Sequence, residues 1–262
     1  MKILVLFFLF VSLSIAASVE DKQTREFERA LKQAQQGDEI EIYNTAYYYQ
    51  LGLGINVNLA EAKKWFKKAE LTKNGAVHYK LGRLYETGTF FERNMMKAVK
   101  HYHLSAKQSD PLGMNNYGLL LLKGQGITKN EIEGIRWLKK AANARMPESS
   151  LNLGLYYQSK NNINEAKIWF EKAAKIGNIR ARVVLAGIYR KERNYEEALI
   201  HYRSAAEENN SEAQYYLALM ADKGLGMERS PTIAKEWLEA SAKNGFKKAS
   251  RVLERTRASK NK

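Results

Sequence analysis

One pattern occurs six times along this 262-residue chain, and it constrains the fold more than any single residue does. A segment with helical apolar spacing carries a small residue, and a second segment follows with a tryptophan or a histidine. The small residues are Ala46, Gly82, Gly118, Gly154, Ala186 and Ala218, at steps of 36, 36, 36, 32 and 32 residues. A period of this length is typical of arrays in which each copy forms one supersecondary unit.

The spacing between the two segments separates rigid parts from variable ones. The tryptophans and histidines of the second segments are Trp65, His101, Trp137, Trp169, His201 and Trp237. Each of the first five lies 17 residues before the next small residue, whereas the distance within a copy is 19 residues, or 15 in copies four and five. This pattern indicates two rigid helices joined by a turn of variable length.

Within a copy the apolar residues recur at steps of three and four, as Val77, Leu81 and Leu84 do, which predicts helices. Glycines just beyond the first segments supply the left-handed residue that commonly ends a helix. We therefore expect an all-α fold, a right-handed α-solenoid of about six antiparallel helix pairs with a half-repeat cap at each end.

The turns carry a double glycine, as in Tyr49-Gln-Leu-Gly52-Leu-Gly54 and the equivalent stretches ending at Gly126 and Gly226. Together with the small residue and the tryptophan, they resemble the Sel-one-like repeat (SLR) family, a relative of the tetratricopeptide repeat. Copies four and five lack the double glycine and look more like tetratricopeptide units. Copy two has Phe90 where the second glycine belongs.

We expect one solenoid domain over residues 18–262, because no linker interrupts the copies. The expected repeats cover about 39–75, 76–110, 111–146, 147–178, 179–210 and 211–246. Half repeats over residues 22–37 and 247–258 are expected to cap the array.

Residues 1–17 differ in composition from the rest. Lys2 precedes a short apolar run, and Ser14-Ile-Ala16 offers the small residues that a signal peptidase recognises. The run is short for a membrane span, so we expect a cleaved signal peptide, with cleavage after Ala16 or Ala17, and a periplasmic or secreted mature protein. An uncleaved anchor is the alternative.

Composition limits the partners. The formal net charge is +15 and the chain has no cysteine, so no disulfide stabilises its helix pairs as in some secreted SLR proteins. A solvated basic face is the simplest interpretation, and an anionic cell-envelope component or an acidic protein is the alternative. No recognised nucleic-acid motif accompanies the charge, so we expect no nucleic-acid partner and no membrane span after signal cleavage.

No constellation of residues predicts an enzyme, a metal site or a cofactor. The double-glycine turns lack the Lys-Ser/Thr of a nucleotide loop and follow helices rather than strands. His101 and His201 occupy the tryptophan position and are expected to pack inward, while His78 has no histidine neighbour in the sequence. Serines and aspartates are scattered, with no nucleophile motif.

Binding in a helical solenoid usually uses the concave wall made by successive first helices. Transferring the tetratricopeptide pattern places the exposed positions three before, one after and four after each small residue. Among these positions we select the following partner-binding candidates: Tyr43, Tyr47, Gln50, Tyr79, Arg83, Glu86, Asn115, Gln158, Arg190 and Tyr215. Tyr43, Tyr47, Tyr79 and Arg83 are the strongest candidates, because aromatic residues and arginine dominate binding energies.

The resemblance implies a non-enzymatic protein-protein interaction scaffold or adaptor, in the bacterial envelope or secreted, that binds a partner segment in its groove. Two alternatives remain open. One is a cell-wall-related hydrolase or β-lactam-binding protein, as cysteine-rich relatives suggest. The other is an electrostatic binder of anionic envelope polymers.

Overall fold

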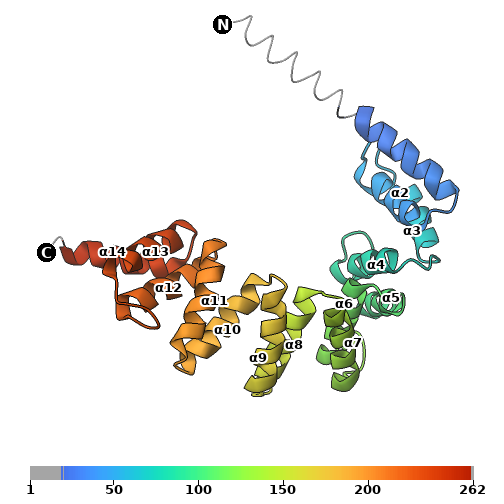
Figure 1. Ribbon diagram of the computed structural model, residues 1–262. Helices are drawn as coiled ribbons and strands as arrows, with labels where there is room; N and C mark the ends of the chain where they lie inside the picture. Colours follow the sequence, from blue (N-terminus) through green and yellow to red (C-terminus); the bar gives the residue numbers. More distant parts are fainter. Residues whose placement is uncertain (1–18, 20, 261–262) are drawn as a thin grey trace, which may run out of the picture. The chain divides into compact units, whose positions relative to one another are not determined.

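The computed structural model describes Val19 and residues 21–260, with side chains to residue 256. The predicted signal peptide, residues 1–17, and its predicted cleavage point therefore lie outside the described residues. All regular structure in the described part of the chain is helical, which confirms the predicted fold class (Figure 1). In that part, no helix is long and apolar enough to cross a bilayer.

Among the described residues, six helix pairs follow a leading helix over residues 21–35. The pairs are α2 (Glu39–Leu51) with α3 (Leu59–Ala69), α4 (Gly75–Thr87) with α5 (Met95–Lys107), α6 (Pro111–Lys123) with α7 (Glu131–Asn143), α8 (Pro147–Ser159) with α9 (Ile163–Lys175), α10 (Ile179–Lys191) with α11 (Tyr195–Glu207), and α12 (Ser211–Lys223) with α13 (Pro231–Lys243). A last helix, α14 (Lys247–Lys260), packs on α13.

The chain divides into two compact units between Ala141 and Ala142. In the N-terminal unit α2 packs on α3, and α4 packs on α5. Successive first helices are also in contact, α2 with α4 and α4 with α6 (Figure 1). In the C-terminal unit α8 packs on α9, α10 on α11, and α12 on α13.

The helix starts follow from side-chain caps. Asparagine or aspartate accepts a hydrogen bond from the third residue of most helices, as Asn74 does from Val77 and Asn178 from Ala181. Such caps satisfy one of the backbone donors that a helix leaves unpaired at its first turn. The position of each cap residue therefore marks where its helix begins.

The small residue of each first helix is required by the side chain that lies against it. A Cβ added to Gly82 would come within 2.8 Å of the Tyr102 ring, and one added to Gly154 within 2.5 Å of Phe170. Both rings are fully buried and each follows the tryptophan or histidine position by one residue. The residue after the tryptophan or histidine, rather than the tryptophan or histidine itself, therefore fills the space between the paired helices.

The second glycine of the turn allows one copy to touch the preceding one. Gly126 and Gly226 have φ near +70°, and a Cβ at either would overlap the backbone of Met95 or Tyr195, at the start of the preceding second helix. Glycine is needed both for the left-handed conformation and for the close approach. In copy two, Phe90 takes this place, and its ring packs 4.8 Å from that of Phe66.

Candidate functional site

The predicted binding residues of the N-terminal unit lie on α2, α4 and α6, but their three rows differ in exposure. The row one residue after the small residue is open, with Tyr47 42 % exposed and Arg83 exposed. The row four residues after it is half-buried, as at Gln50 and Glu86.

The row three residues before the small residue is mostly buried, which corrects the predicted exposure of Tyr43 and Asn115. Tyr43 is 7 % exposed and Asn115 5 %. The Tyr43 ring packs against Phe66 of the paired helix at 5.4 Å, so most of its surface faces the helix pair. Tyr79, in the same row, remains half-buried.

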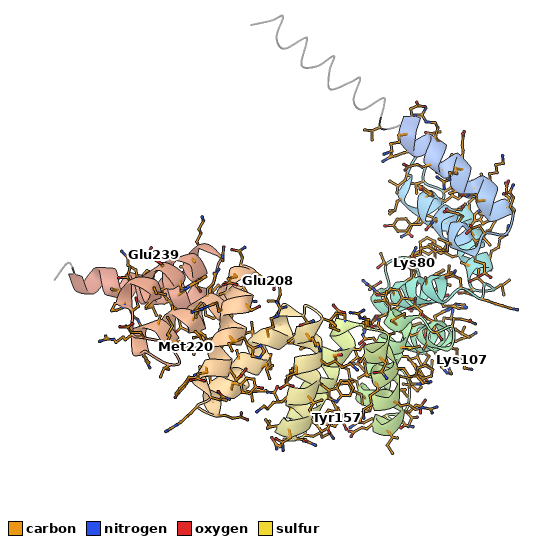
Figure 2. All side chains as sticks on the ribbon, in the orientation of Figure 1. Lys80, Lys107, Tyr157, Glu208, Met220 and Glu239 are labelled. Carbon is orange, nitrogen blue, oxygen red and sulfur yellow. The ribbon has the colours of Figure 1, made fainter. Side chains whose placement is uncertain are left out.

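Aromatic rings and cations lie together on α2 and α4. The Tyr43 and Tyr47 rings stack at 6.5 Å, and the Lys80 ammonium lies 4.9 Å from the Tyr43 ring centroid. Figure 2 shows Lys80 on α4. Burial raises the pKa of Tyr43 to about 12, with Tyr47 adding to the rise and the nearby Arg83 opposing it. This face therefore presents tyrosine surface beside two positive charges, a composition common at binding hot spots.

A polar network continues this face along α4. The Arg83 guanidinium hydrogen-bonds Tyr79, and the Tyr102 hydroxyl donates to Glu86 Oε2 at 2.5 Å. Burial and the hydrogen bond to Glu86 raise the pKa of Tyr102 above its usual range, so the phenol stays protonated as a donor. These hydrogen bonds hold Arg83, a member of the same exposed row as Tyr47, and the adjacent Glu86 in place.

In the C-terminal unit, the predicted residues Gln158 and Arg190 line one cavity of about 220 Å³. Residues of α10 and α12 form most of its wall, including Val183, Gly187 and Tyr216. The Arg190 guanidinium lies 4.9 Å from the Tyr216 ring centroid and hydrogen-bonds the buried Tyr202. Tyr215 lies beside this cavity rather than in it, with its ring 5.5 Å from that of Tyr216 and 5.2 Å from that of Phe246.

Sequence reasoning missed several residues of these faces, namely Lys80, Tyr102, Tyr202 and Tyr216. Tyr102 and Tyr202 lie on second helices, one residue after the histidine, where the transferred pattern assigns no binding position. Lys80 and Tyr216 lie on first helices, two residues before the small residue, where the transferred pattern likewise assigns no binding position.

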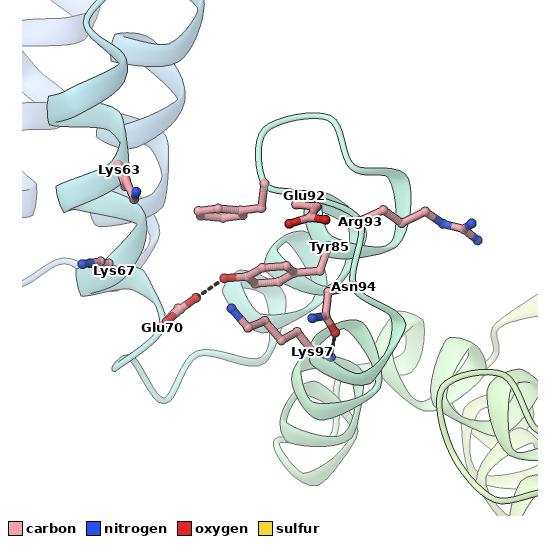
Figure 3. Close-up of a pocket in the computed structure, with 9 residues that line it drawn as sticks. Lys63, Lys67, Glu70, Tyr85, Glu92, Arg93, Asn94 and Lys97 are labelled. Carbon is pink, nitrogen blue, oxygen red and sulfur yellow. Dashed lines mark hydrogen bonds between the residues drawn. The ribbon is translucent and has the colours of Figure 1, made fainter.

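A second cavity, of about 410 Å³, lies between α3 and the turn from α4 to α5, where Phe90 replaces glycine. Figure 3 shows the Tyr85 hydroxyl directed at Glu70, to which it donates at 2.6 Å, and Lys97 beside them, while Arg93 extends away. Lys63, Lys67 and Glu92 complete the charged lining. Four cations and two carboxylates line this cavity, so its lining is net positive.

Behind this cavity lies a histidine pair that the sequence did not reveal, because the two residues are 23 positions apart. His101 packs inward as predicted, at 4 % exposure, but His78 is not isolated, since the two Nδ1 atoms lie 3.2 Å apart. His78 Nε2 donates to the Thr72 carbonyl at 2.9 Å, so the neutral His78 accepts from His101. His101 Nε2 lies 3.9 Å from Glu70.

These histidines do not form a metal centre with their neighbours. Across residues 21–256, no group of three or more histidine, aspartate or glutamate side chains is placed to hold a metal ion. His201, at the same position in copy five, is half-buried and stacks on Tyr189 at 5.8 Å.

The arrangement defines a class of protein, a helical-repeat array whose first helices carry the accessible aromatic and charged side chains. The chain belongs to the Sel1 repeat family, which matches residues 42–70, 76–110, 111–145, 183–210 and 211–246. Residues 147–176 match the tetratricopeptide repeat instead, as expected for copy four, which lacks the double glycine. Copy five lacks it too, but residues 183–210 match the Sel1 repeat, so its predicted tetratricopeptide character is wrong. Sel1 and tetratricopeptide-like repeats act as protein-interaction scaffolds.

Three relatives place the chain among known proteins. The HRD3B component of the ERAD-associated E3 ubiquitin-protein ligase of Arabidopsis thaliana is 36 % identical over 113 residues, which are 42 % of this chain and 17 % of that protein. The protective antigen c5321 of uropathogenic Escherichia coli, described as displaying an SLR fold, has a TM-score of 0.78 and 25 % identity to this protein. The match covers 85 % of this chain and 50 % of the antigen's chain. A Sel1 repeat protein from Oxalobacter formigenes has a TM-score of 0.64 and 29 % identity, over 82 % and 84 % of the two chains.

Proposed function

We propose that this protein is a non-enzymatic scaffold that binds a segment of a partner protein on the faces of its first helices. The observation that carries the proposal is the open row of those helices. In the N-terminal unit this row holds the exposed Tyr47 and Arg83, with Lys80 nearby on α4, and in the C-terminal unit it includes Gly187, which lines a cavity with Arg190. The family's role as an interaction scaffold supports the same conclusion.

The form of these faces suits a polypeptide better than a small polar substrate. Tyr47 and Arg83 lie on successive first helices, so their side chains offer separate contacts to one extended partner. Large aromatic side chains provide much contact area at little cost in side-chain entropy, and arginine adds directional hydrogen bonds from a planar group. The faces supply several weak anchors in place of one deep pocket.

We propose in addition that the protein works outside the cytoplasm, in the bacterial envelope or as a secreted protein. The support is the N-terminal sequence, with Lys2, an apolar run and Ser14-Ile-Ala16. Fractionation of the cells that make the protein, followed by N-terminal sequencing, tests this. A mature chain beginning at residue 17 or 18 is expected, and an unprocessed chain in the cytoplasmic fraction would contradict it.

The binding proposal is tested with a partner first identified by crosslinking in the native cell and then purified. Replacing Tyr47 and Arg83 together by alanine should weaken binding at least tenfold, since each is a hot-spot residue type worth about 1 kcal/mol or more. The helix content should stay unchanged, because both side chains are exposed.

A matched control removes an exposed apolar residue and an exposed arginine from a second helix. Ile132→Ala with Arg136→Ala on α7 meets this need, since Ile132 is 84 % exposed and Arg136 is exposed. The control should bind as the parent protein does. Equal affinity of both double variants would show that the first-helix face of the N-terminal unit does not bind the partner.

A further inference from the structure

We infer that the cavity of the C-terminal unit receives a carboxylate group of the bound polypeptide, with Arg190 as its cationic partner. The inference rests on the proposed function and adds the chemistry that one of its faces recognises. It starts from Arg190, for which no ion pair is found among the described residues, although Glu212 lines the same cavity.

Arg190 is half-buried, and its partners are neutral. Its guanidinium hydrogen-bonds the phenol of Tyr202 and lies over the ring of Tyr216. Its Nε is shielded from solvent and has no hydrogen-bond partner, and within residues 21–256 no carboxylate lies within ion-pair distance of it. A shielded charge without a counter-charge is costly, so a carboxylate arriving here gains more than it would from an exposed arginine.

The cavity has room because residue 187 is glycine. A Cβ at Gly187 would meet a single neighbouring atom, the Tyr202 hydroxyl oxygen at 3.6 Å, so the space in front of α10 is open. Val183 and Ile188 give the cavity apolar walls. At about 220 Å³ it is smaller than most sites for whole small molecules, and it fits one short side chain or a chain terminus.

The charges around the cavity favour a carboxylate over a more highly charged group. Lys191 and Glu212 line it together with Arg190, which leaves one net positive charge. A carboxylate matches that charge and the planar donors of a guanidinium, whereas a doubly charged phosphate exceeds it and would be repelled more strongly by Glu212. A polypeptide supplies carboxylates from aspartate, glutamate or its C-terminus.

The test titrates three blocked peptides into the purified protein labelled with ¹⁵N-arginine, at constant ionic strength, and follows the Nε–Hε resonance of Arg190. Acetyl-Ala-Glu-Ala-amide carries a side-chain carboxylate, acetyl-Ala-Ala with a free C-terminus carries a terminal one, and acetyl-Ala-Gln-Ala-amide carries none. A saturable shift with either acidic peptide, absent with the glutamine peptide, is expected, and the peptide that gives it identifies the source. Equal shifts with all three peptides, or no saturable shift, would overturn the inference.

Variants connect the signal to the cavity. Gly187→Leu fills the space and should abolish the saturable shift while leaving the helix content unchanged. Arg190→Lys removes the planar donors and identifies the resonance, and it should weaken peptide binding at least fivefold when binding is followed by calorimetry. Arg180→Lys, an exposed residue of the same helix, is the matched control and should change nothing.

The outcomes separate this inference from the proposed function. If the acidic peptides fail to bind while the purified natural partner still binds and is weakened by Gly187→Leu, the face binds protein without using a carboxylate. If the partner also binds Gly187→Leu and the Tyr47 and Arg83 variant as it binds the parent, the proposed function itself is wrong.

Discussion

Mild acid should destabilise this protein through the buried pair His78 and His101. Burial lowers the pKa of His101 from 6.5 to about 4, and the adjacent His78 lowers it further, while Glu70 opposes the change. The pKa of His78 is also lowered, chiefly by burial. In the unfolded chain both imidazoles return to their ordinary pKa, so between pH 6.5 and 4 the unfolded state binds more protons than the folded state.

The sign and size follow from this difference. A depressed folded-state pKa means that the stability is fully present above pH 6.5 and is lost as the pH falls toward 4. For one group shifted from 6.5 to about 4, lowering the pH from 7 to 5 costs about 2 kcal/mol of unfolding free energy. His78 adds to this loss in the same direction.

The surroundings of the pair explain why the protonated form is not rescued. Glu70 lies 3.9 Å from His101 Nε2 but already accepts the Tyr85 hydroxyl. Lys97 and Lys100 add positive charge nearby and oppose protonation of His101. Protonation of His101 would therefore place a charge in a buried site with only partial compensation.

The assay is urea unfolding at pH 7 and pH 5, followed by far-ultraviolet circular dichroism, for the parent protein and for His101→Phe. The variant cannot titrate at position 101, so it should lose about 2 kcal/mol less than the parent between the two pH values. His201→Phe changes the same repeat position in copy five, where the ring is half-buried and has no histidine neighbour, and should reduce the loss by less. An equal loss in the parent and in His101→Phe would refute the reasoning.

Three further substitutions test the packing, each by its effect on urea unfolding. Trp137→Ala should destabilise by about 3 to 5 kcal/mol, because the ring is 9 % exposed and packs 5.8 Å from that of Tyr117; an unchanged midpoint would exclude a core role. Gly154→Ala should destabilise by about 1 to 3 kcal/mol, because its Cβ would lie 2.5 Å from the Phe170 ring. Gly187→Ala should instead stabilise by about 0.5 to 1 kcal/mol, since its Cβ fits and alanine favours the helix; the same sign for both glycines would contradict the packing described.

The repeat pattern predicted the helical fold because it combines many weak signals. Steps of 36 and 32 residues, caps and glycine ends all agree on where helices begin and end, and local consistency of this kind is strong support for a fold. Copies four and five lack glycine at the end of the first helix, yet Asn161 and Arg193 adopt the left-handed conformation there. The pattern survives this change because the turn needs the conformation more than it needs glycine.

The candidate site could be predicted only by position, and position does not determine exposure. Tyr43 and Asn115 occupy a row that the transferred pattern treats as open, but both are buried, Tyr43 because its ring packs against Phe66 of the paired helix. The pairing of His78 with His101 depends on the crossing of α4 and α5, and spacing along the chain gives no sign of it. The cavity at Arg190 is open because Gly187 has no side chain. In the sequence, Gly187 is only a glycine inside a predicted helix, and nothing there indicates that it borders a cavity.

The contact made by the second turn glycine has a consequence for recombining such repeats. Gly126 belongs to copy three but is required by the backbone at Met95 of copy two, so the unit that can be exchanged extends across the boundary between copies. A repeat placed after a new neighbour will pack against it only if its turn glycine fits closely against the backbone at the start of that neighbour's second helix. Successful insertions and deletions in this family should therefore cut between the turn glycine and the start of the second helix that follows it, where both halves of each junction stay together.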